Sequence, residues 1–124
     1  MSYSNRFTGA ITITPPLTYD EIKNTPRTND AELGIVEERT ETATGWTATM
    51  IADAIVGPDE PCNGYDVEEN IQAIIDANPG HEFAGFIEAA WDAGFGEPPS
   101  RFVVRDRRVV RVDAVYTWPE EAGA

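Results

Sequence analysis

Most apolar segments of this chain repeat with a two-residue period, and this constrains the fold more than any other feature. Residues 7–14 alternate between two faces, one of which carries Phe7, Gly9, Ile11 and Ile13. Such alternation with β-branched residues is typical of a half-buried strand. Residues 67–75 differ, because their apolar side chains recur at the helical spacings i, i+4, i+7 and i+8. Several strands and one clear helix predict an α+β layer fold.

Turn and cap signals divide the first half of the chain. We expect Pro15-Pro16 to end the first strand, because proline cannot donate to a ladder of hydrogen bonds. Thr18 and Glu21 form a capping-box pattern that predicts a short helix near 18–23. Strands are predicted over 33–42 and 46–56, joined at 43–45 by a turn in which Gly45 supplies a positive φ.

The second half begins with the main helix, predicted at about 66–78. Asp66 is the expected N-cap, and Glu69 completes a capping-box pair. Residues 81–91 fit either a helix or a strand, and we favour a strand because Gly85 weakens a helix by about 1 kcal/mol relative to alanine. A second hairpin is predicted from 101–105 and 109–118, with a turn at 106–108.

Two segments of the chain echo each other, and together with these elements they suggest an architecture. Phe7-Thr8-Gly9-Ala10-Ile11 resembles Phe83-Ala84-Gly85-Phe86-Ile87, either by chance or because two strands share one role in a pseudo-repeated sheet. We expect a single α+β domain over 1–124. Its single antiparallel sheet of five to six strands is built from hairpins, with the main helix packed on one face. Large aromatic side chains dominate burial, so the core is expected to contain Trp46, Trp91 and Trp118.

The net charge of −13 is concentrated in the middle of the chain. Residues 28–100 carry 16 acids and one base, Arg39, whereas five arginines lie in 101–111. Such a surface repels phosphate backbones and anionic lipid, so we expect neither direct nucleic-acid binding nor membrane binding. The acids form either a solvated surface or a face that docks on a basic protein. The acids expected to contribute to such a face are Glu37, Glu38, Glu41, Asp59, Glu60, Glu68 and Glu69.

Candidate chemical sites are few. The loop at Asp59 resembles a calcium loop, but Pro61 and Asn70 replace two of the required ligands. Cys62 and His81, the only thiol and imidazole, are separated by the predicted helix. We therefore assign no catalytic residue, cofactor or metal ligand. The alternative is a small metal-assisted enzyme built on the carboxylates of 59–69.

The arginine-rich C-terminal segment allows two interpretations. Arg101 and Arg105 share one face of a strand, and Arg111 is expected beside them on the partner strand. They either pair with the protein's own acids or form a small anion site, because the guanidinium fork suits carboxylates and phosphates.

Cysteine content and hydropathy bear on location. A lone cysteine excludes an internal disulfide, which fits a reducing compartment. No apolar run approaches the roughly 20 residues needed to span a bilayer. We expect a soluble cytoplasmic protein, and the sequence leaves its oligomeric state open.

Several short motifs carry a family resemblance. They are Phe7-x-Gly9, Ile11-x-Ile13, Pro15-Pro16-Leu17, Asp20-Glu21-Ile22-Lys23, Tyr65-Asp66-Val67 and Pro79-Gly80 before Phe83-x-Gly85, followed by the arginine-turned hairpin ending at Trp118. In these the chain resembles an uncharacterised family of small acidic proteins from actinobacteria and their phages. The resemblance implies an α+β domain in a bacterial or phage setting and carries no established activity.

These observations together favour one function over two alternatives. The expected function is non-catalytic and regulatory, with an acidic face docked on a basic host protein, including mimicry of a nucleic acid. The alternatives are the metal-assisted enzyme and a virion accessory protein.

Overall fold

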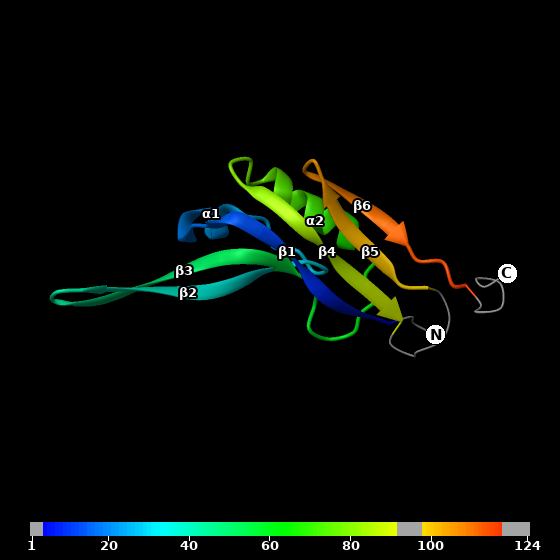
Figure 1. The fold of residues 1–124 in the computed structure, drawn as a ribbon, viewed down its shortest axis with the longest axis horizontal. Helices are drawn as coiled ribbons and strands as arrows, with labels where there is room; N and C mark the ends of the chain where they lie inside the picture. Colours follow the sequence, from blue (N-terminus) through cyan, green and yellow to red (C-terminus); the bar gives the residue numbers. More distant parts are fainter. Residues whose placement is uncertain (1–3, 92–97, 118–124) are drawn as a thin grey trace.

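The structure, a computed structural model, describes residues 4–91 and 98–117 (Figure 1). Its strands are β1 (Asn5–Leu17), β2 (Glu32–Thr42), β3 (Gly45–Val56), β4 (Glu82–Trp91), β5 (Ser100–Arg105) and β6 (Arg108–Asp113). Helix α1 (Tyr19–Asn24) lies between β1 and β2 in the chain, and helix α2 (Val67–Asp76) between β3 and β4.

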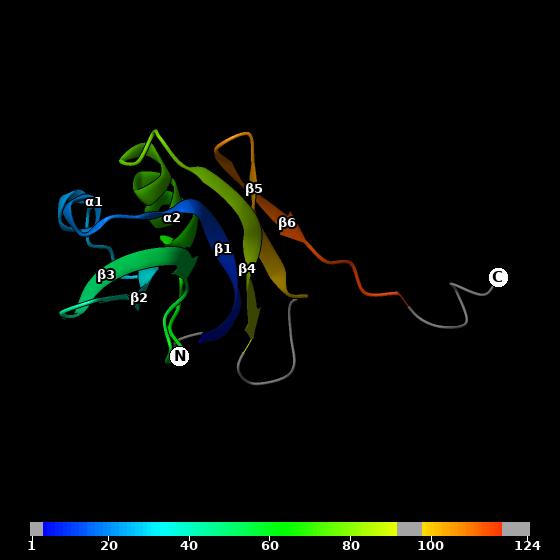
Figure 2. The same cartoon turned by 60° about the vertical axis from the view of Figure 1, so that its left-hand side comes forward.

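All six strands form one open antiparallel sheet in the order β2-β3-β1-β4-β5-β6. The prediction of a single antiparallel sheet built from hairpins is confirmed, as are the two helices. Residues 82–91, which fitted either a helix or a strand, form β4. Strands β1 and β4 lie at the centre, and each edge of the sheet is a hairpin (Figure 2).

The two echoing segments, Phe7–Ile11 and Phe83–Ile87, overlap in the pairing of β1 with β4, where residues 9–11 face residues 85–87. Gly9 and Gly85 each face an isoleucine of the other segment, and their φ angles are +84° and +115°. A Cβ added to either would lie 2.8 Å or 2.7 Å from a carbonyl oxygen of the facing strand. The two strands thus make the same close approach reciprocally, about a local twofold axis. The echo therefore has a shared structural role.

The core combines residues of the sheet and of α2. Its fully buried large side chains are Ile11, Ile13, Leu17, Ile55, Val67, Ile71, Ile74, Ile75 and Ile87. In α2 the buried residues are those of the helical stripe found in the sequence. Burying each such side chain contributes roughly 1.5–3 kcal/mol, so this cluster is the main source of stability.

Two predicted strand ends are wrong. Strand β1 continues through Pro15-Pro16 to Leu17. Its pairing register with β3 skips from Thr12 to Leu17, so neither proline needs to donate a backbone hydrogen bond to β3. Strand β6 ends at Asp113 rather than at residue 118. The next backbone N–H, that of Ala114, still donates in register to the carbonyl of Pro99 at 3.0 Å, but Pro99 has no N–H to donate in return, so the ladder ends. Trp118 lies outside the described residues.

The caps of the two helices differ. In α1 the capping box is confirmed, because Thr18 N–H donates to Glu21 Oε1 at 3.0 Å and Glu21 N–H donates to Thr18 Oγ1 at 3.3 Å. In α2 the predicted capping by Asp66 is wrong, since its side chain makes no cap hydrogen bond. Its φ and ψ of −110° and 16° depart from the extended conformation of a capping residue. Instead its N–H donates to Asp30 Oδ2 at 2.9 Å.

The turns also refine the predictions. The β2–β3 turn contains Ala43 and Thr44, and Gly45 is the first residue of β3 without the positive φ that we expected. In the β5–β6 turn Asp106 and Arg107 have φ angles of 49° and 65°. Positive φ at both turn residues matches the twist of the flanking strands.

The side chain of Arg107 links this turn to the C-terminal end of α2. Its guanidinium donates to the carbonyl oxygens of Ile75 at 2.7 Å, Asn78 at 3.2 Å and His81 at 2.5 Å. Of these three carbonyls, that of Ile75 lies in the last turn of α2, where it also accepts from the Asn78 N–H at 3.1 Å, and the other two lie just beyond the helix. Among the described residues, no helix is long and apolar enough to cross a membrane.

Candidate functional site

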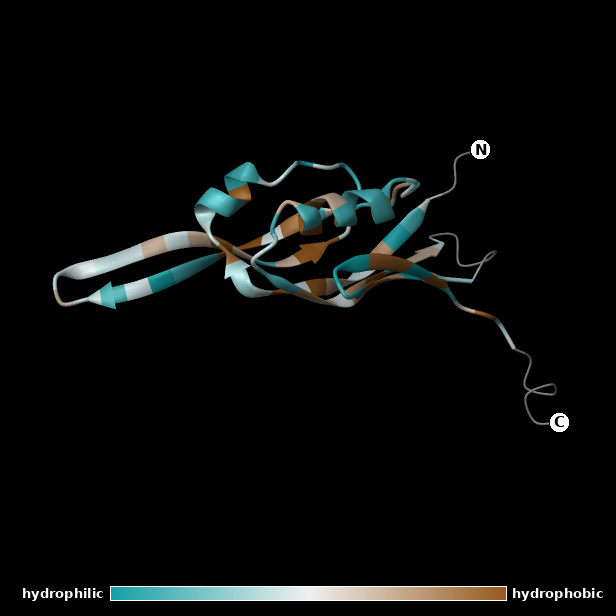
Figure 3. Cartoon of the chain, turned by 90° about the horizontal axis from the view of Figure 1, so that it is seen from above, coloured by the Kyte–Doolittle hydropathy of each residue, from teal (hydrophilic) through white to brown (hydrophobic). Residues whose placement is uncertain are grey.

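The β2–β3 hairpin extends beyond the rest of the sheet (Figures 1 and 3). Strand β3 pairs with β1 only near its C-terminal end, at 52–55, whereas β2 and β3 pair with each other along their full length. Residues 35–50, here called the arm, are all exposed. A two-stranded ribbon with nothing packed on it is at best marginally stable in water. The arm is therefore a surface that the rest of the described chain leaves uncovered.

The pairing register divides the side chains of the arm between two faces, because opposed residues in a strand pair point to the same side. The first, the Trp46 face, consists of Ile35, Glu37, Arg39, Glu41, Trp46, Ala48 and Met50. The second, the Thr47 face, consists of Val36, Glu38, Thr40, Thr42, Thr47 and Thr49. In Figure 3 the outer part of β2 is hydrophilic, whereas β3 is paler and locally hydrophobic.

Apolar side chains are exposed mainly on the Trp46 face. The exposed fractions are 62% for Trp46, 47% for Ile35 and 43% for Met50. The guanidinium of Arg39 lies 5.3 Å from the centre of the Trp46 ring, and its Nε lies 2.6 Å from Glu37 Oε1. The only base of the arm is therefore paired within it. Glu41 adds negative charge to the same face.

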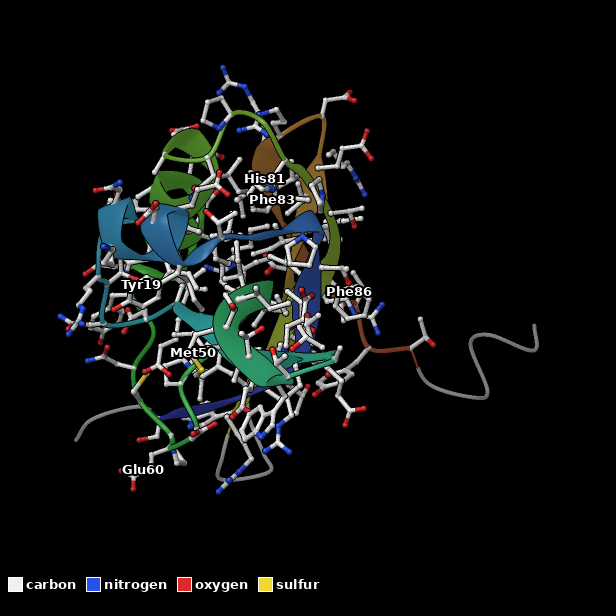
Figure 4. The ribbon with its side chains drawn as sticks, turned by 90° about the vertical axis from the view of Figure 1, so that its left-hand side faces the viewer. Tyr19, Met50, Glu60, His81, Phe83 and Phe86 are labelled. Atoms are coloured by element: carbon white, nitrogen blue, oxygen red, sulfur yellow. The ribbon has the colours of Figure 1, made fainter. Side chains whose placement is uncertain are left out.

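A groove of about 540 Å³ lies where the arm meets α1. Its apolar lining consists of Tyr19, Ile22, Pro26, Ala31, Leu33, Ile35 and Ile74. Because Ile35 belongs both to this groove and to the Trp46 face, the two form adjoining surfaces. Viewed along the hairpin, Met50 lies on the same side of the strands as Tyr19, and Phe86 lies on the other side (Figure 4).

The seven acids singled out in the sequence are all exposed and fall into two groups. Glu37, Glu38 and Glu41 lie on the arm, with Glu38 on the Thr47 face. The others lie in the loop before α2 or in the first turn of that helix: Asp59, Glu60, Glu68 and Glu69. The end of the arm points away from α2 (Figure 1).

The three arginines of the predicted anion site do not share a face. Arg101 and Arg105 lie on one side of β5, whereas Arg111 is paired with Phe102 and lies on the other. The expectation that Arg111 lies beside the other two is wrong, because the two-residue turn sets a register that reverses its side. Arg101 Nε lies 2.9 Å from Glu88 Oε1, with the guanidinium 4.3 Å from the centre of the Phe86 ring.

Arg111 is also engaged within the chain. Its Nε donates to Asp113 Oδ1 at 2.9 Å, and the Ser100 hydroxyl donates to the same oxygen at 2.6 Å. The bond from Ser100, followed by that from Arg111, lowers the pKa of Asp113 below its ordinary value. Arg111 and Asp113 thus form an exposed ion pair.

A second hollow, of about 330 Å³, lies at the opposite end of the sheet from the arm. Aromatic side chains line it, those of Phe7, Tyr65, Trp91 and Phe102, together with Glu68 and Arg111. Two of its lining residues, Trp91 and Pro98, flank residues 92–97, which lie outside the described part of the chain.

Cys62 and His81 have separate partners. Cys62 Sγ lies 3.9 Å from Asp30 Oδ1. Burial, together with the nearby Asp30 charge, raises the pKa of the thiol and so opposes the thiolate form that nucleophilic catalysis needs. The ring nitrogens of His81 lie 2.6 Å from the carbonyl oxygen of Pro15 and 2.6 Å from Glu21 Oε2. Among the described residues, no group of three or more histidines, cysteines, aspartates or glutamates is placed to hold a metal ion.

Sequence reasoning missed the exposed apolar residues of the arm. Trp46 was expected in the core and is instead mostly exposed, while Trp91 is half-buried. The available signal was that polar residues occupy both faces of 37–49, where a strand that covers a core would have one apolar face.

Comparison with known proteins gives one positive finding. A protein-family model matches residues 1–124, and its description is a family of unknown function. No curated protein and no solved structure matches the chain.

Proposed function

The chain belongs to this family of unknown function (DUF6205). We propose that it is a small non-catalytic binding protein. Its acidic surface docks on a basic partner protein, and the arm is the element that makes the contact. The partner is a basic host protein of the bacterial cytoplasm. Proteins that bind nucleic acid are included, because an acidic ribbon presents the same sign of charge as a phosphate backbone.

The observation that carries this proposal is the projecting arm itself. It contributes no residue to the hydrophobic core, yet it presents three carboxylates and four large apolar side chains to solvent. Acidic groups steer a basic partner during encounter, and apolar groups supply area to bury once contact is made. An element with both properties and no internal packing role suits recognition.

In this proposal, different parts of the sheet provide stability and binding. Helix α2 packs on one face of the sheet and stabilises the fold, which the burial of its four apolar residues supports. The arm lies beyond this covered region. Folding and binding therefore depend on different residues. Nothing in the structure specifically favours the metal-assisted enzyme or the virion accessory protein, so we propose neither.

Affinity capture from a bacterial lysate tests the proposed function. Wild-type protein is compared with Glu37→Gln/Glu38→Gln/Glu41→Gln at about 50 mM and about 300 mM salt, because these concentrations bracket weak and strong screening. We expect basic proteins to be retained by the wild type at low salt and lost with the variant. The matched control is Glu68→Gln/Glu69→Gln, which removes two exposed acids from α2. Equal capture by all three proteins would refute the role of the arm.

A further inference from the structure

We propose that the Trp46 face of the arm binds an amphipathic helix of the partner. The apolar side of that helix covers Ile35, Met50 and Trp46, and its flanking lysines or arginines pair with Glu41 and compete with Arg39 for Glu37. This inference rests on the proposed function and specifies the structural element and chemistry of the basic partner.

The dimensions of the arm suit a single helix. Its two strands lie about 4.8 Å apart, so the ribbon with its side chains is about 10 Å wide, close to the diameter of one helix. From Ile35 to Glu41 the ribbon extends about 20 Å at about 3.3 Å per residue. A helix of about 13 residues has this length.

The composition of the two faces selects the Trp46 face. Ile35, Met50 and Trp46 all lie on it, whereas the Thr47 face is dominated by threonines and has Val36 as its only large exposed apolar residue among the described ones. The Trp46 face also adjoins the groove beside α1 through Ile35. A helix seated on the arm would therefore continue the helical layer on the side of the sheet where Tyr19 lies (Figure 4).

Charge argues against other occupants. The arm of a second copy carries the same net negative charge, so two arms repel each other, and nucleic acid is repelled for the same reason. A strand added to the open edge of β2 is opposed by the charges of Glu37, Glu38, Arg39 and Glu41 along that edge, a common way of blocking edge pairing. A basic amphipathic helix satisfies both the apolar and the acidic groups.

The test uses a synthetic helical peptide of about 18 residues, or five turns, with leucines on one face and lysines on the other. The first control peptide has the same residues in scrambled order, and the second has glutamates in place of lysines. Binding is followed by the fluorescence of Trp46 in the full chain carrying Trp91→Phe and Trp118→Phe. We expect a blue shift with the amphipathic lysine peptide and none with either control.

Two substitutions on opposite faces of the arm make the test specific. Met50 and Val36 are exposed to nearly the same extent, 43% and 41%, but lie on opposite faces. We expect Met50→Ser to weaken binding about tenfold, because it removes an apolar side chain that the helix would bury. Val36→Ser should change it less than about twofold, as for a side chain outside the contact. Both variants are first checked for unchanged circular dichroism.

The outcomes separate this inference from the proposed function. If the two variants weakened peptide binding equally, or if the scrambled peptide bound as tightly as the amphipathic one, the inference that the Trp46 face binds a helix would be wrong. If lysate capture depends on the acids of the arm but the peptide shows no face preference, the proposed function stands and this inference falls. If capture is independent of those acids, the proposed function falls, and the peptide result alone decides whether the face binds helices.

Discussion

At the scale of single residues, His81 links β1, α1 and the start of β4. It is 8% exposed, and both of its ring nitrogens face acceptors, the carbonyl oxygen of Pro15 and the carboxylate of Glu21. A ring that donates to both is the protonated imidazolium. Burial opposes that charge, but the hydrogen bonds to Glu21 and Pro15 outweigh it and raise the pKa of His81.

The pKa of Glu21 shifts in the opposite direction. The bond from the Thr18 backbone, followed by that from His81, lowers the pKa of Glu21. Its contribution to stability is therefore present above its ordinary value of 4.5 and is lost as the pH falls through the lowered value. The contribution of His81 is present below its ordinary value of 6.5 and is lost as the pH rises through the raised value.

The pair should therefore stabilise the fold most between these two ordinary pKa values. We predict that the free energy of unfolding of the wild type falls between about pH 5.5 and about pH 8.5 and falls less in His81→Gln. Urea denaturation at both pH values measures this difference. An equal fall in the two proteins would show that His81 does not hold a proton in the folded state.

Arg107 gives a second prediction at this scale. Its guanidinium makes three hydrogen bonds to backbone carbonyls, and its side chain is partly buried. Hydrogen bonds from a charged group contribute about 1.5–3 kcal/mol, so Arg107→Ala should lower the free energy of unfolding by about that amount. Arg105→Ala, at an exposed site on the same hairpin, should change it by less than about 0.5 kcal/mol. Urea denaturation of both variants distinguishes them, and similar losses would contradict the capping role.

Single-residue roles were predictable only where both partners are close in sequence. Thr18 and Glu21 lie three residues apart, and their capping box is as predicted. Asp30 binds the N–H of Asp66 from 36 residues away, and Arg107 reaches carbonyls of α2 and its flank from a turn about 30 residues later. Such partners depend on the tertiary fold, which local patterns do not encode.

At the scale of elements, the central β1–β4 pair depends on its two glycines. Gly85 has a φ of +115°, and a Cβ there would lie 2.7 Å from the carbonyl oxygen of Ala10. We predict that Gly85→Ala lowers the free energy of unfolding by more than about 1 kcal/mol, since both the backbone conformation and the close contact oppose a side chain.

Gly45 is the matched control for this substitution. It lies near the hairpin turn without a positive φ, and a Cβ there meets nothing within 4 Å. Gly45→Ala should change stability by less than about 0.5 kcal/mol. Thermal and urea denaturation of the two variants provide the comparison. A Gly45→Ala variant as unstable as Gly85→Ala would show that the loss reflects glycine replacement in general.

Element types were more predictable than element ends or exposures. Alternation identified β1, and the helical stripe identified the buried face of α2. The prediction of strands over 33–42 and 46–56 did not show that this hairpin extends beyond its neighbours, because any strand that covers it must come from elsewhere in the chain. The exposed arm, and with it the candidate docking surface, was therefore missed as an element although three of its acids had been singled out.

At the scale of the whole molecule, the net charge of −13 affects how the stability of the fold depends on salt. Like charges in a compact state repel one another, and salt screens this repulsion. Apart from the His81–Glu21 pair, whose burial protects it from screening, the described ion pairs are largely exposed and so contribute little that salt could remove. We predict that raising salt from about 20 mM to about 300 mM increases the thermal unfolding midpoint. A midpoint that falls with salt would mean that ion pairs outweigh the net repulsion.

The arm also bears on how such a protein can diverge. None of its residues from 35 to 50 belongs to the core, so a substitution there meets no packing constraint from the described fold. A change of binding partner through the arm would therefore leave the residues of the core unchanged. Under the proposed function, related chains can acquire new partners by altering these residues alone, while the sheet stays the same.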